Sequence, residues 1–351
     1  DTKLLHFVLS NVDISEHLAS GRVYITDNLK DLLNKLSATY INKDKVEIVY
    51  LKNYALVRSK ELLELTQKVY ETCKTKMVDV NTIAKFSKKW LLNTLRNIST
   101  VNNSSISLLS DLENKFIGQT ALIVAAGPSL NENIEKIKAN RDKFIIFAVN
   151  KVLRTLEANG ITPDFAGCLD ASAISATYTG LEDYCAKFNC ISDLKSDAAI
   201  LLSSFKKHFL TFSETDFIVK KLINFNKSFK TYELGGSATT MALVLASKLG
   251  FSKIVFAGLD LAFKNDIMYS TGETVNKAPN GQIITGNSTK NLVKVKSVTG
   301  GMVSTRDDYA AFINHFETLI KDLGIKEVYN TTSFGAAIEG MKNVAFDDIP
   351  L

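Results

Sequence analysis

Between residues 120 and 330 the chain alternates short apolar runs with segments whose apolar residues recur every three or four positions. The runs have the length and composition of buried strands, and the intervening segments have the period of helices. This alternation predicts an α/β fold with a Rossmann-like, doubly wound, mostly parallel sheet covered by helices on both faces. Strands are predicted at 121–126, 144–149, 165–169 and 253–257, with weaker candidates at 199–203, 209–212 and 327–329. Helices are predicted to start near residue 130 and to span 152–159, 238–249 and 309–323.

The first 115 residues have a different pattern and predict a smaller α/β and helical region. The Asn- and Ser-rich stretch 99–107 predicts a break before a short helix that leads to Phe116. We therefore expect two domains, residues 1–115 and residues 116–351. In the first, strands are predicted at 4–9, 22–25 and 46–51, and helices at 29–36, 60–75 and 81–98.

The turn Gly127-Pro128-Ser129 follows the first strand of the sheet directly and precedes a helical pattern. Ser129 and Glu132 have the spacing of a capping box, which places a helix N-terminus just beyond Gly127. Free N–H groups and the positive dipole end favour an anion there, and glycine permits close approach of a ligand to the backbone. Pro128 occupies a turn position where its missing N–H matters little. The alternative is an ordinary strand-to-helix turn.

Other small and polar residues fall at the ends of the predicted strands, where ligands of parallel sheets bind. Asn150, Asp170 and Asp260 each follow a strand, and the turn Gly235-Gly236-Ser237 opens a later helix. Their convergence predicts a ligand site at this edge of the sheet. Each residue also has a structural interpretation, because Asn and Asp commonly cap helices or turns and glycines permit close helix packing.

The segment 264–304 is long, polar and poor in apolar periodicity. A connection of this length inside a compact domain is typical either of a functional lid or of disorder. Its glycines supply hinges, and Tyr269 is one of its polar groups. Thr305 and Asp308 have the spacing of a second capping box. His315 falls inside the helical pattern that follows, and we interpret it as a surface or core residue.

The composition is that of a globular protein, with 351 residues of which 46% are apolar. No apolar run reaches the length of a membrane span and the N-terminus lacks the regions of a signal peptide, so a cytoplasmic protein is expected. The four cysteines lack metal-type spacing, and neither a disulfide nor a metal site is expected. The net charge of +5 is modest and its basic residues are dispersed, which argues against nucleic-acid binding.

Taken together, the motifs resemble those of the motility-associated-factor (Maf) flagellin glycosyltransferases over about residues 85–345. The residues that carry the resemblance are Trp90, Asn93, Asn97, 122–130, 148–150, 163–164, 169–170, 236–237, 258–263, Thr305 and 335–340. That family is similar in its central domain to bacterial sialyltransferases, which use a CMP-activated nonulosonic acid. The resemblance implies a sialyltransferase-like domain that transfers pseudaminic or legionaminic acid from CMP to Ser or Thr of flagellin, with inversion at the sugar carbon.

The resemblance also assigns site residues. In the sialyltransferases the Gly-Pro-Ser turn, an Asn after the next strand and a small-residue turn at a later helix contact the cytidine nucleotide. Tyr269 roughly matches a tyrosine that stabilises the leaving phosphate, whereas the general-base histidine has no match, which leaves Asp170 and Asp260 as catalytic candidates. No cofactor is required beyond the CMP-activated donor sugar, and flagellin is the expected partner. The matching nucleotide-binding residues are Gly127, Pro128, Ser129, Asn150, Gly235, Gly236 and Ser237.

Two other functions stay open at this point. The same domain type resembles an archaeal pterin pyrophosphokinase, in which the turn would bind ATP phosphates and Asp170 and Asp260 would hold magnesium. A non-catalytic flagellin-binding protein is the third reading. The N-terminal region and the long polar insertion favour the glycosyltransferase, because a compact small-molecule kinase requires neither. Longer Maf proteins continue with a helical region beyond the equivalent of Leu351, so the chain is either a fragment or a short family member.

Overall fold

The computed structural model describes residues 2–40, 45–50, 52–101, 106–171, 178–197, 200, 204–214, 216, 218–221, 230–263 and 292–350. The chain divides into two compact units, Asp1–Lys85 and Phe86–Leu351. The division lies within a single long helix, α5 (Ser59–Val101), upstream of the boundary near residue 115 that the sequence predicts.

The described part of the first unit is helical. The strand predicted at 4–9 is wrong, because these residues lie inside α1, and 22–25 and 46–50 form no regular structure. A short apolar run cannot be assigned to strand or helix by its periodicity alone, which explains the error. The helix predicted at 29–36 is confirmed, and Asn28 caps it by accepting from the N–H groups of Lys30 and Asp31. The helices of this unit are α1 (Thr2–Asn11), α2 (Ser15–Ala19), α3 (Leu29–Thr39), α4 (Lys52–Val57) and the first part of α5.

The two long helices predicted at 60–75 and 81–98 form the single helix α5. The intervening residues contain neither glycine nor proline, so nothing in them ends a helix. The predicted break at 99–107 therefore begins later, since the helix continues to Val101.

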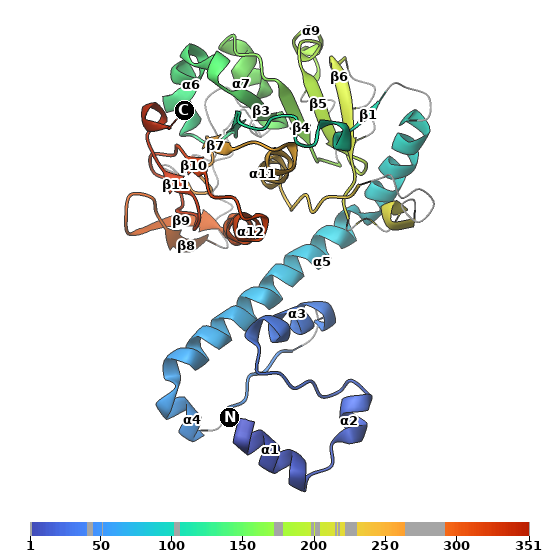
Figure 1. Ribbon diagram of the computed structural model, residues 1–351, viewed down its shortest axis with the longest axis vertical. Coiled ribbons are helices and arrows are strands. Elements are labelled where there is room, and N and C mark those ends of the chain that lie inside the picture. Colours follow the sequence, from blue (N-terminus) through green and yellow to red (C-terminus); the bar gives the residue numbers. More distant parts are fainter. Residues whose placement is uncertain are drawn as a thin grey trace, which may run out of the picture. The chain divides into compact units, whose positions relative to one another are not determined.

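The second unit contains a nine-stranded sheet in the order β1-β6-β5-β4-β3-β2-β7-β10-β11, and every strand pair of this sheet is parallel. This confirms the predicted α/β fold with a doubly wound parallel sheet (Figure 1). Its strands are β1 (Ser107–Leu108), β2 (Thr120–Val124), β3 (Ile145–Val149), β4 (Phe165–Cys168), β5 (Asn189–Asp193), β6 (Lys207–Thr211), β7 (Lys253–Ala257), β10 (Val328–Asn330) and β11 (Lys342–Asn343).

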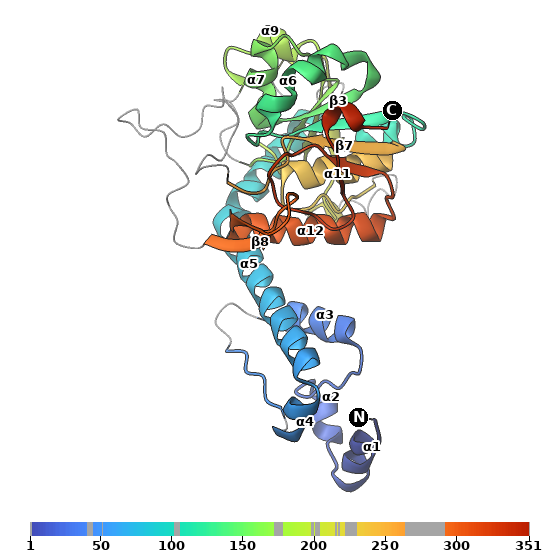
Figure 2. The same ribbon diagram turned by 90° about the vertical axis from the view of Figure 1, so that its left-hand side faces the viewer.

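Helices cover both faces of this sheet, as Figures 1 and 2 show. Leu122 and Val124 of β2 belong to the apolar cluster that contains α6 and α7, whereas Ala121 and Ile123 belong to the cluster that contains α11 and α12. Alternate residues of one strand thus face opposite helix layers, and both sets are buried. This is why the strands appear in the sequence as continuous apolar runs. The helices are α6 (Leu130–Ala139), α7 (Leu153–Ala158), α9 (Glu182–Cys185), α11 (Ala238–Leu249) and α12 (Asp307–Leu323), and short 3-10 turns span Leu109–Leu112, Arg141–Lys143, Asn150–Val152 and Phe346–Asp348.

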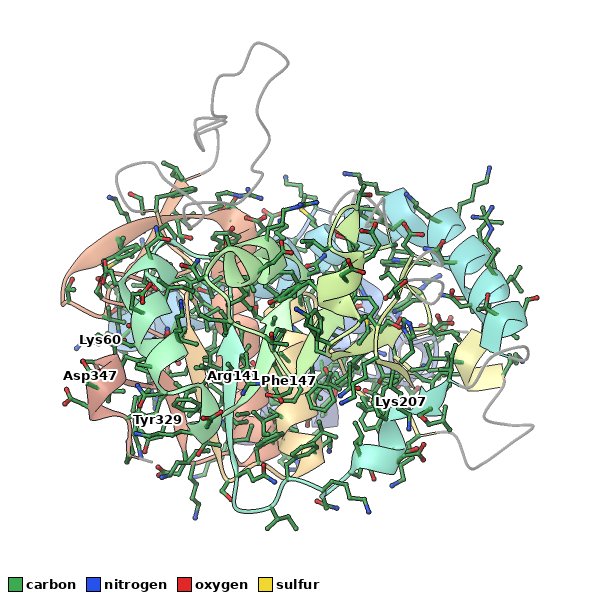
Figure 3. The ribbon with its side chains drawn as sticks, turned by 90° about the horizontal axis from the view of Figure 1, so that it is seen from above. Lys60, Arg141, Phe147, Lys207, Tyr329 and Asp347 are labelled. Atoms are coloured by element: carbon green, nitrogen blue, oxygen red, sulfur yellow. The ribbon has the colours of Figure 1, made fainter. Side chains whose placement is uncertain are left out.

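Aromatic side chains fill the centre of the sheet. Phe147 of β3, labelled in Figure 3, stacks on Phe165 of β4 with ring centroids 4.9 Å apart. At the end of the sheet where the strands begin, Arg141 donates to the carbonyl of Thr162 and pairs with Asp164 at 2.9 Å. These contacts hold the beginnings of β3 and β4 in register and leave the opposite edge available for a site.

Several described elements of the second unit are absent from the sequence prediction, among them the short elements β1, β11 and α9. Strand β5 is polar at both ends, so its apolar signal is too short to detect. The predicted loop 264–304 contains an antiparallel hairpin of β8 (Leu292–Lys296) and β9 (Met302–Arg306), which corrects part of that prediction. The remainder, 264–291, lies outside the described residues, as does most of the weak strand candidate 199–203. No helix in the described part is both long and apolar enough to cross a membrane.

Candidate functional site

The strand order places a change of direction between β2 and β7. Strands β3 to β6 extend the sheet on one side of β2, and β7, β10 and β11 extend it on the other. In doubly wound sheets the ligand crevice lies outside the carboxyl ends of the strands at such a point. Helices α11 and α12 precede the parallel strands β7 and β10, so they begin at the same edge.

The turn 127–129 lies at this edge, but its N–H groups are already bonded. Leu130 N donates to Gly127 O at 3.0 Å, and Asn131 N donates to Pro128 O at 3.2 Å. The N–H of Ser129 donates to the carboxylate of Asp260 at 2.9 Å. A protein carboxylate therefore occupies the place at the start of α6 where the sequence argument expects a ligand anion.

The predicted capping box at this turn is wrong. Ser129 has helical backbone angles and its side chain accepts no capping hydrogen bond. The same holds for the second predicted box, because Arg306 is the N-cap of α12 without a side-chain cap, and the Thr305 hydroxyl donates to the carbonyl of Leu261 at 2.6 Å. Spacing alone does not show how a helix is capped: α6 begins at Leu130 as expected but without a side-chain cap, and α12 begins at Asp307, two residues before the predicted start.

Gly127 is required by packing within the protein. A Cβ at this position would lie 2.5 Å from Asp260 Oδ2 and 2.5 Å from the carbonyl oxygen of Gly258. The Gly127 N–H also donates to Gly258 O at 2.9 Å. The glycine therefore serves the contact between the turn after β2 and the end of β7, and that contact positions Ser129.

Asp260 is 2% exposed and both of its carboxylate oxygens accept hydrogen bonds. Oδ2 accepts from Ser129 N, and Oδ1 accepts from the Thr332 hydroxyl at 2.5 Å. Burial raises the pKa of this carboxyl, while hydrogen bonds from Ser129 and Thr332 oppose the rise. Its position at the carboxyl edge agrees with the sequence argument, but its contacts are those of a carboxylate that holds loops together.

Asn150 is a buried polar residue without a side-chain partner in the part of the chain that the structure describes. It is 9% exposed, and neither the 3-10 turn that it begins nor α7 uses it as a cap. The capping interpretation is therefore not supported. The hydroxyl of Ser129 is also buried; it is near enough to Asp260 to lower the pKa of that carboxyl but makes no well-formed hydrogen bond within the described residues.

Buried polar groups in folded proteins are almost always hydrogen-bonded. The Asn150 amide follows β3, and the Ser129 hydroxyl follows β2, which is the neighbouring strand. Two incompletely bonded polar groups on adjacent strand ends, beside the change of direction, identify this part of the edge as the candidate site.

The turn 235–237 opens α11 at the same edge. The Ser237 hydroxyl accepts from Thr240 N at 3.1 Å and so caps the helix. Gly235 has φ of +74°, a conformation that side chains rarely adopt, and Gly236 is exposed. Helix α11 packs on β2, β3 and β4, so this helix start lies over the strand ends that carry Ser129 and Asn150.

His315 is a neighbour of the site that sequence reasoning missed. A Cβ at Gly235 would lie 3.4 Å from His315 Cε1 and one at Gly236 would lie 3.6 Å from Phe312 Cε1. Both side chains come from α12, some eighty residues along the chain. The helical spacing of Phe312 and His315 predicts that they share a face, but no local signal shows that this face meets the glycine turn.

The remaining predicted site residues are not brought together. Asp170 is exposed after β4, and two strands separate β4 from β7, so the ends that carry Asp170 and Asp260 lie about 14 Å apart at the usual strand spacing. The two carboxylates therefore do not form a pair. Tyr269 lies outside the described residues. No group of three or more His, Cys, Asp or Glu side chains within the described ranges is arranged to hold a metal ion.

Helix α5 fixes the loops that follow β4 and β5. The Asn93 amide donates to the carbonyls of Ala171 and Lys195, each at 3.1 Å. The Asn97 amide donates to the carbonyls of Leu194 and Ser196 at 2.8 and 3.0 Å. These two asparagines, four residues apart on one face of the helix, give a physical reason for that part of the sequence motif.

Residues 92–266 match the family model described as 6-hydroxymethylpterin diphosphokinase MptE-like. An uncharacterised protein of Treponema pallidum (strain Nichols) is 30% identical over 115 residues, which cover 33% of this chain and 51% of that protein. The structure of the Maf glycosyltransferase from Magnetospirillum magneticum AMB-1 superposes with a TM-score of 0.70 at 19% identity, over 100% of this chain and 53% of that chain. This chain thus spans about half the length of these two relatives.

Proposed function

Since the chain has the fold of a Maf glycosyltransferase, as its motifs implied, we propose that it is a glycosyltransferase. It transfers a nonulosonic acid, pseudaminic or legionaminic acid, from CMP to Ser or Thr hydroxyls of flagellin in the cytoplasm. The acceptor oxygen bonds to the anomeric carbon as the bond from that carbon to the phosphate oxygen breaks, and CMP leaves. The hydroxyl proton passes to a base on the protein, and the configuration at the anomeric carbon inverts.

The observation that carries this proposal is Asn150, a residue 9% exposed with no side-chain hydrogen bond within the described residues, at the strand end adjacent to the one that carries the buried, unbonded Ser129 hydroxyl. Neutral donors and acceptors at this depth suit the ribose and base of a nucleotide, which offer hydroxyl, carbonyl and amino groups. A buried amide that gains such a partner contributes about 1 to 3 kcal/mol, because its loss leaves a desolvated group.

The phosphate of the donor fits the start of α11 better than the start of α6. Asp260 already occupies the N-terminus of α6, whereas the exposed Gly236 lies just before α11, whose positive dipole end is at the carboxyl edge. Negative charge that develops on the leaving phosphate would be stabilised there by preorganised N–H groups. Tyr269 stays the predicted second contact to this phosphate.

The identity of the general base stays a prediction, and the candidates are the carboxylates of Asp170 and Asp260. Asp260 is buried and doubly bonded, so its contacts favour a positioning role. Asp170 is exposed at the end of β4 and is the better placed of the two to reach an acceptor hydroxyl.

Isothermal titration of CMP and of ATP with magnesium into the whole chain tests the proposal. CMP should bind the wild-type protein, and Asn150→Ala should lower its affinity by about 1 to 3 kcal/mol. Asn140→Ala is the matched control, because Asn140 follows the end of α6 at the opposite edge and its side chain bonds to Lys136 O and to no other group within the described residues. Equal CMP affinity in wild type and Asn150→Ala would remove Asn150 from the site.

The same titration separates the other functions. Binding of ATP with magnesium in place of CMP would indicate a pyrophosphokinase, and binding of neither nucleotide would indicate a flagellin-binding protein. Mass spectrometry of flagellin after incubation with a CMP-nonulosonic acid completes the test, since transfer adds the mass of one sugar acid per modified hydroxyl.

A further inference from the structure

Asp260 joins three segments that are distant in the sequence. Its Oδ2 accepts from Ser129 N in the turn after β2, and its Oδ1 accepts from the Thr332 hydroxyl in the loop after β10. Its own carbonyl accepts from Ala336 N at 2.8 Å. These bonds connect Asp260 to residues 131, 72 and 76 positions away.

The backbone around this junction is packed too tightly for side chains. A Cβ at Gly127 would lie 2.5 Å from Asp260 Oδ2, and one at Gly335 would lie 2.6 Å from the Asp260 carbonyl oxygen. Leu261, the next residue, has φ of +44°, a conformation that costs free energy in a residue with a side chain. Such strain persists only where surrounding contacts impose it, and it is common beside functional sites.

Thr332 extends the junction by one further bond. Its hydroxyl donates to Asp260 and accepts from Gly335 N at 3.0 Å. Asp260 thereby receives one hydrogen bond on each oxygen, and Thr332 uses both its donor and an acceptor. The arrangement requires a group with two acceptors at position 260, which a carboxylate provides and an amide does not.

We propose that Asp260, itself held by Thr332, is a positioning residue that locks the turn 127–129 in the conformation that binds the donor nucleotide. This inference rests on the proposed function for the identity of the ligand. The restraint itself is a property of the contacts, because the carboxylate takes the place of a ligand anion at the start of α6 and holds the backbone of Ser129 through its N–H.

A catalytic role for Asp260 makes different demands. A base must reach the acceptor hydroxyl and retain a lone pair for its proton. Asp260 is buried beneath the turn and both of its oxygens are bonded to the protein. The two roles therefore predict different effects of changing Thr332, which leaves the Asp260 carboxyl in the chain but removes one of the two hydrogen-bond partners of its carboxylate.

The test compares Thr332→Val with Thr332→Ser as a matched pair, together with Asp260→Asn. The valine variant keeps the size of the side chain and loses the hydroxyl, whereas the serine variant keeps the hydroxyl. Positioning predicts that Thr332→Val and Asp260→Asn each weaken CMP binding tenfold or more, that Thr332→Ser binds nearly as wild type, and that the double variant Asp260→Asn/Thr332→Val is no weaker than Asp260→Asn. KM for the donor should rise more than kcat falls.

If Asp260 were instead the general base, the opposite effects on CMP affinity and kcat would be expected. Asp260→Asn would lower kcat with CMP affinity unchanged, and Thr332→Val would bind CMP as wild type; this result overturns the proposal. Thermal unfolding shows which variants fold. If Asp260→Asn does not fold, the comparison of Thr332→Val with Thr332→Ser decides between the positioning role and the catalytic role.

The hydrogen-exchange rate of the Ser129 amide measures how firmly Asp260 holds the turn 127–129, and it requires no ligand. It should exchange faster in Thr332→Val than in wild type or Thr332→Ser, and equal rates in all three would overturn the proposal. If the wild-type protein does not bind CMP, the proposed function fails, and the exchange rates alone decide on the lock.

Discussion

The buried carboxyl of Asp193 predicts a specific dependence of stability on pH. Asp193 ends β5, is 1% exposed and accepts a hydrogen bond on Oδ1 from Lys195 N at 2.9 Å. Its Oδ2 has no partner within the described residues. The pKa of Asp193 is raised from 3.8 to about 6, chiefly because the carboxyl is buried; Lys195 opposes the rise and the carboxylate of Asp216 contributes to it.

The sign of the effect follows from where the proton is bound. Between about pH 4 and pH 6 the folded chain keeps the proton on Asp193 while the unfolded chain releases it, so the free energy of unfolding falls as pH rises. The stabilisation is complete below pH 3.8 and is lost as pH passes through about 6. A pKa rise from 3.8 to about 6 corresponds to about 3 kcal/mol.

The assay is urea unfolding of wild type and Asp193→Asn from pH 4 to pH 7.5 at constant ionic strength. Trp90 is the only tryptophan of the chain and lies 5.1 Å from the Lys195 ammonium, so its fluorescence reports on this region. Relative to wild type, the variant should gain up to about 3 kcal/mol as pH rises across this range. Asp142→Asn, an exposed aspartate of the same unit, controls for the loss of one negative charge. A difference between wild type and Asp193→Asn that stays constant with pH would refute the reasoning.

Three further predictions concern the loops and the chemistry. Asn97→Ala should lower the free energy of unfolding by about 2 to 4 kcal/mol in the same urea assay, because two buried carbonyls lose their donor. The control Arg96→Ala, on the exposed side of α5, should change the free energy of unfolding by less than about 0.5 kcal/mol. Gly258→Ala should destabilise the protein more than Gly118→Ala does; both have positive φ, but only at Gly258 would the Cβ overlap the Ala125 carbonyl, and equal losses of melting temperature would contradict this contact. Transfer of the sugar to flagellin should be unaffected by EDTA, and its complete loss, restored by added magnesium, would show that the transfer depends on a metal ion and contradict the prediction.

Local periodicity was sufficient for the parts of the fold that are buried on both faces. Strands β2, β3, β4 and β7 are apolar beyond their first residue because they lie between two helix layers, so consecutive residues of each strand are apolar. The same reasoning fails where burial is one-sided or polar. Residues 4–9 are apolar yet helical, and β5 carries Asn189 and Asp193 at its ends.

For the candidate site, sequence determined which residues stand at the carboxyl edge, since the ends of strands in a parallel sheet share one edge whatever their partners. It did not determine what each residue does there. Asp260 and Asn150 are both polar residues after apolar strands, but one is bonded on both oxygens and the other has no side-chain partner among the described residues.

That difference was decided by tertiary contacts. The partners of Asp260 lie 131 and 72 residues away, and the close approach at Gly127 depends on the end of β7. His315 meets the glycine turn only because α11 and α12 pack side by side. Hydrogen bonds and packing form between groups that folding brings together, and a sequence pattern reports whether a position is buried without reporting which distant residue it will contact.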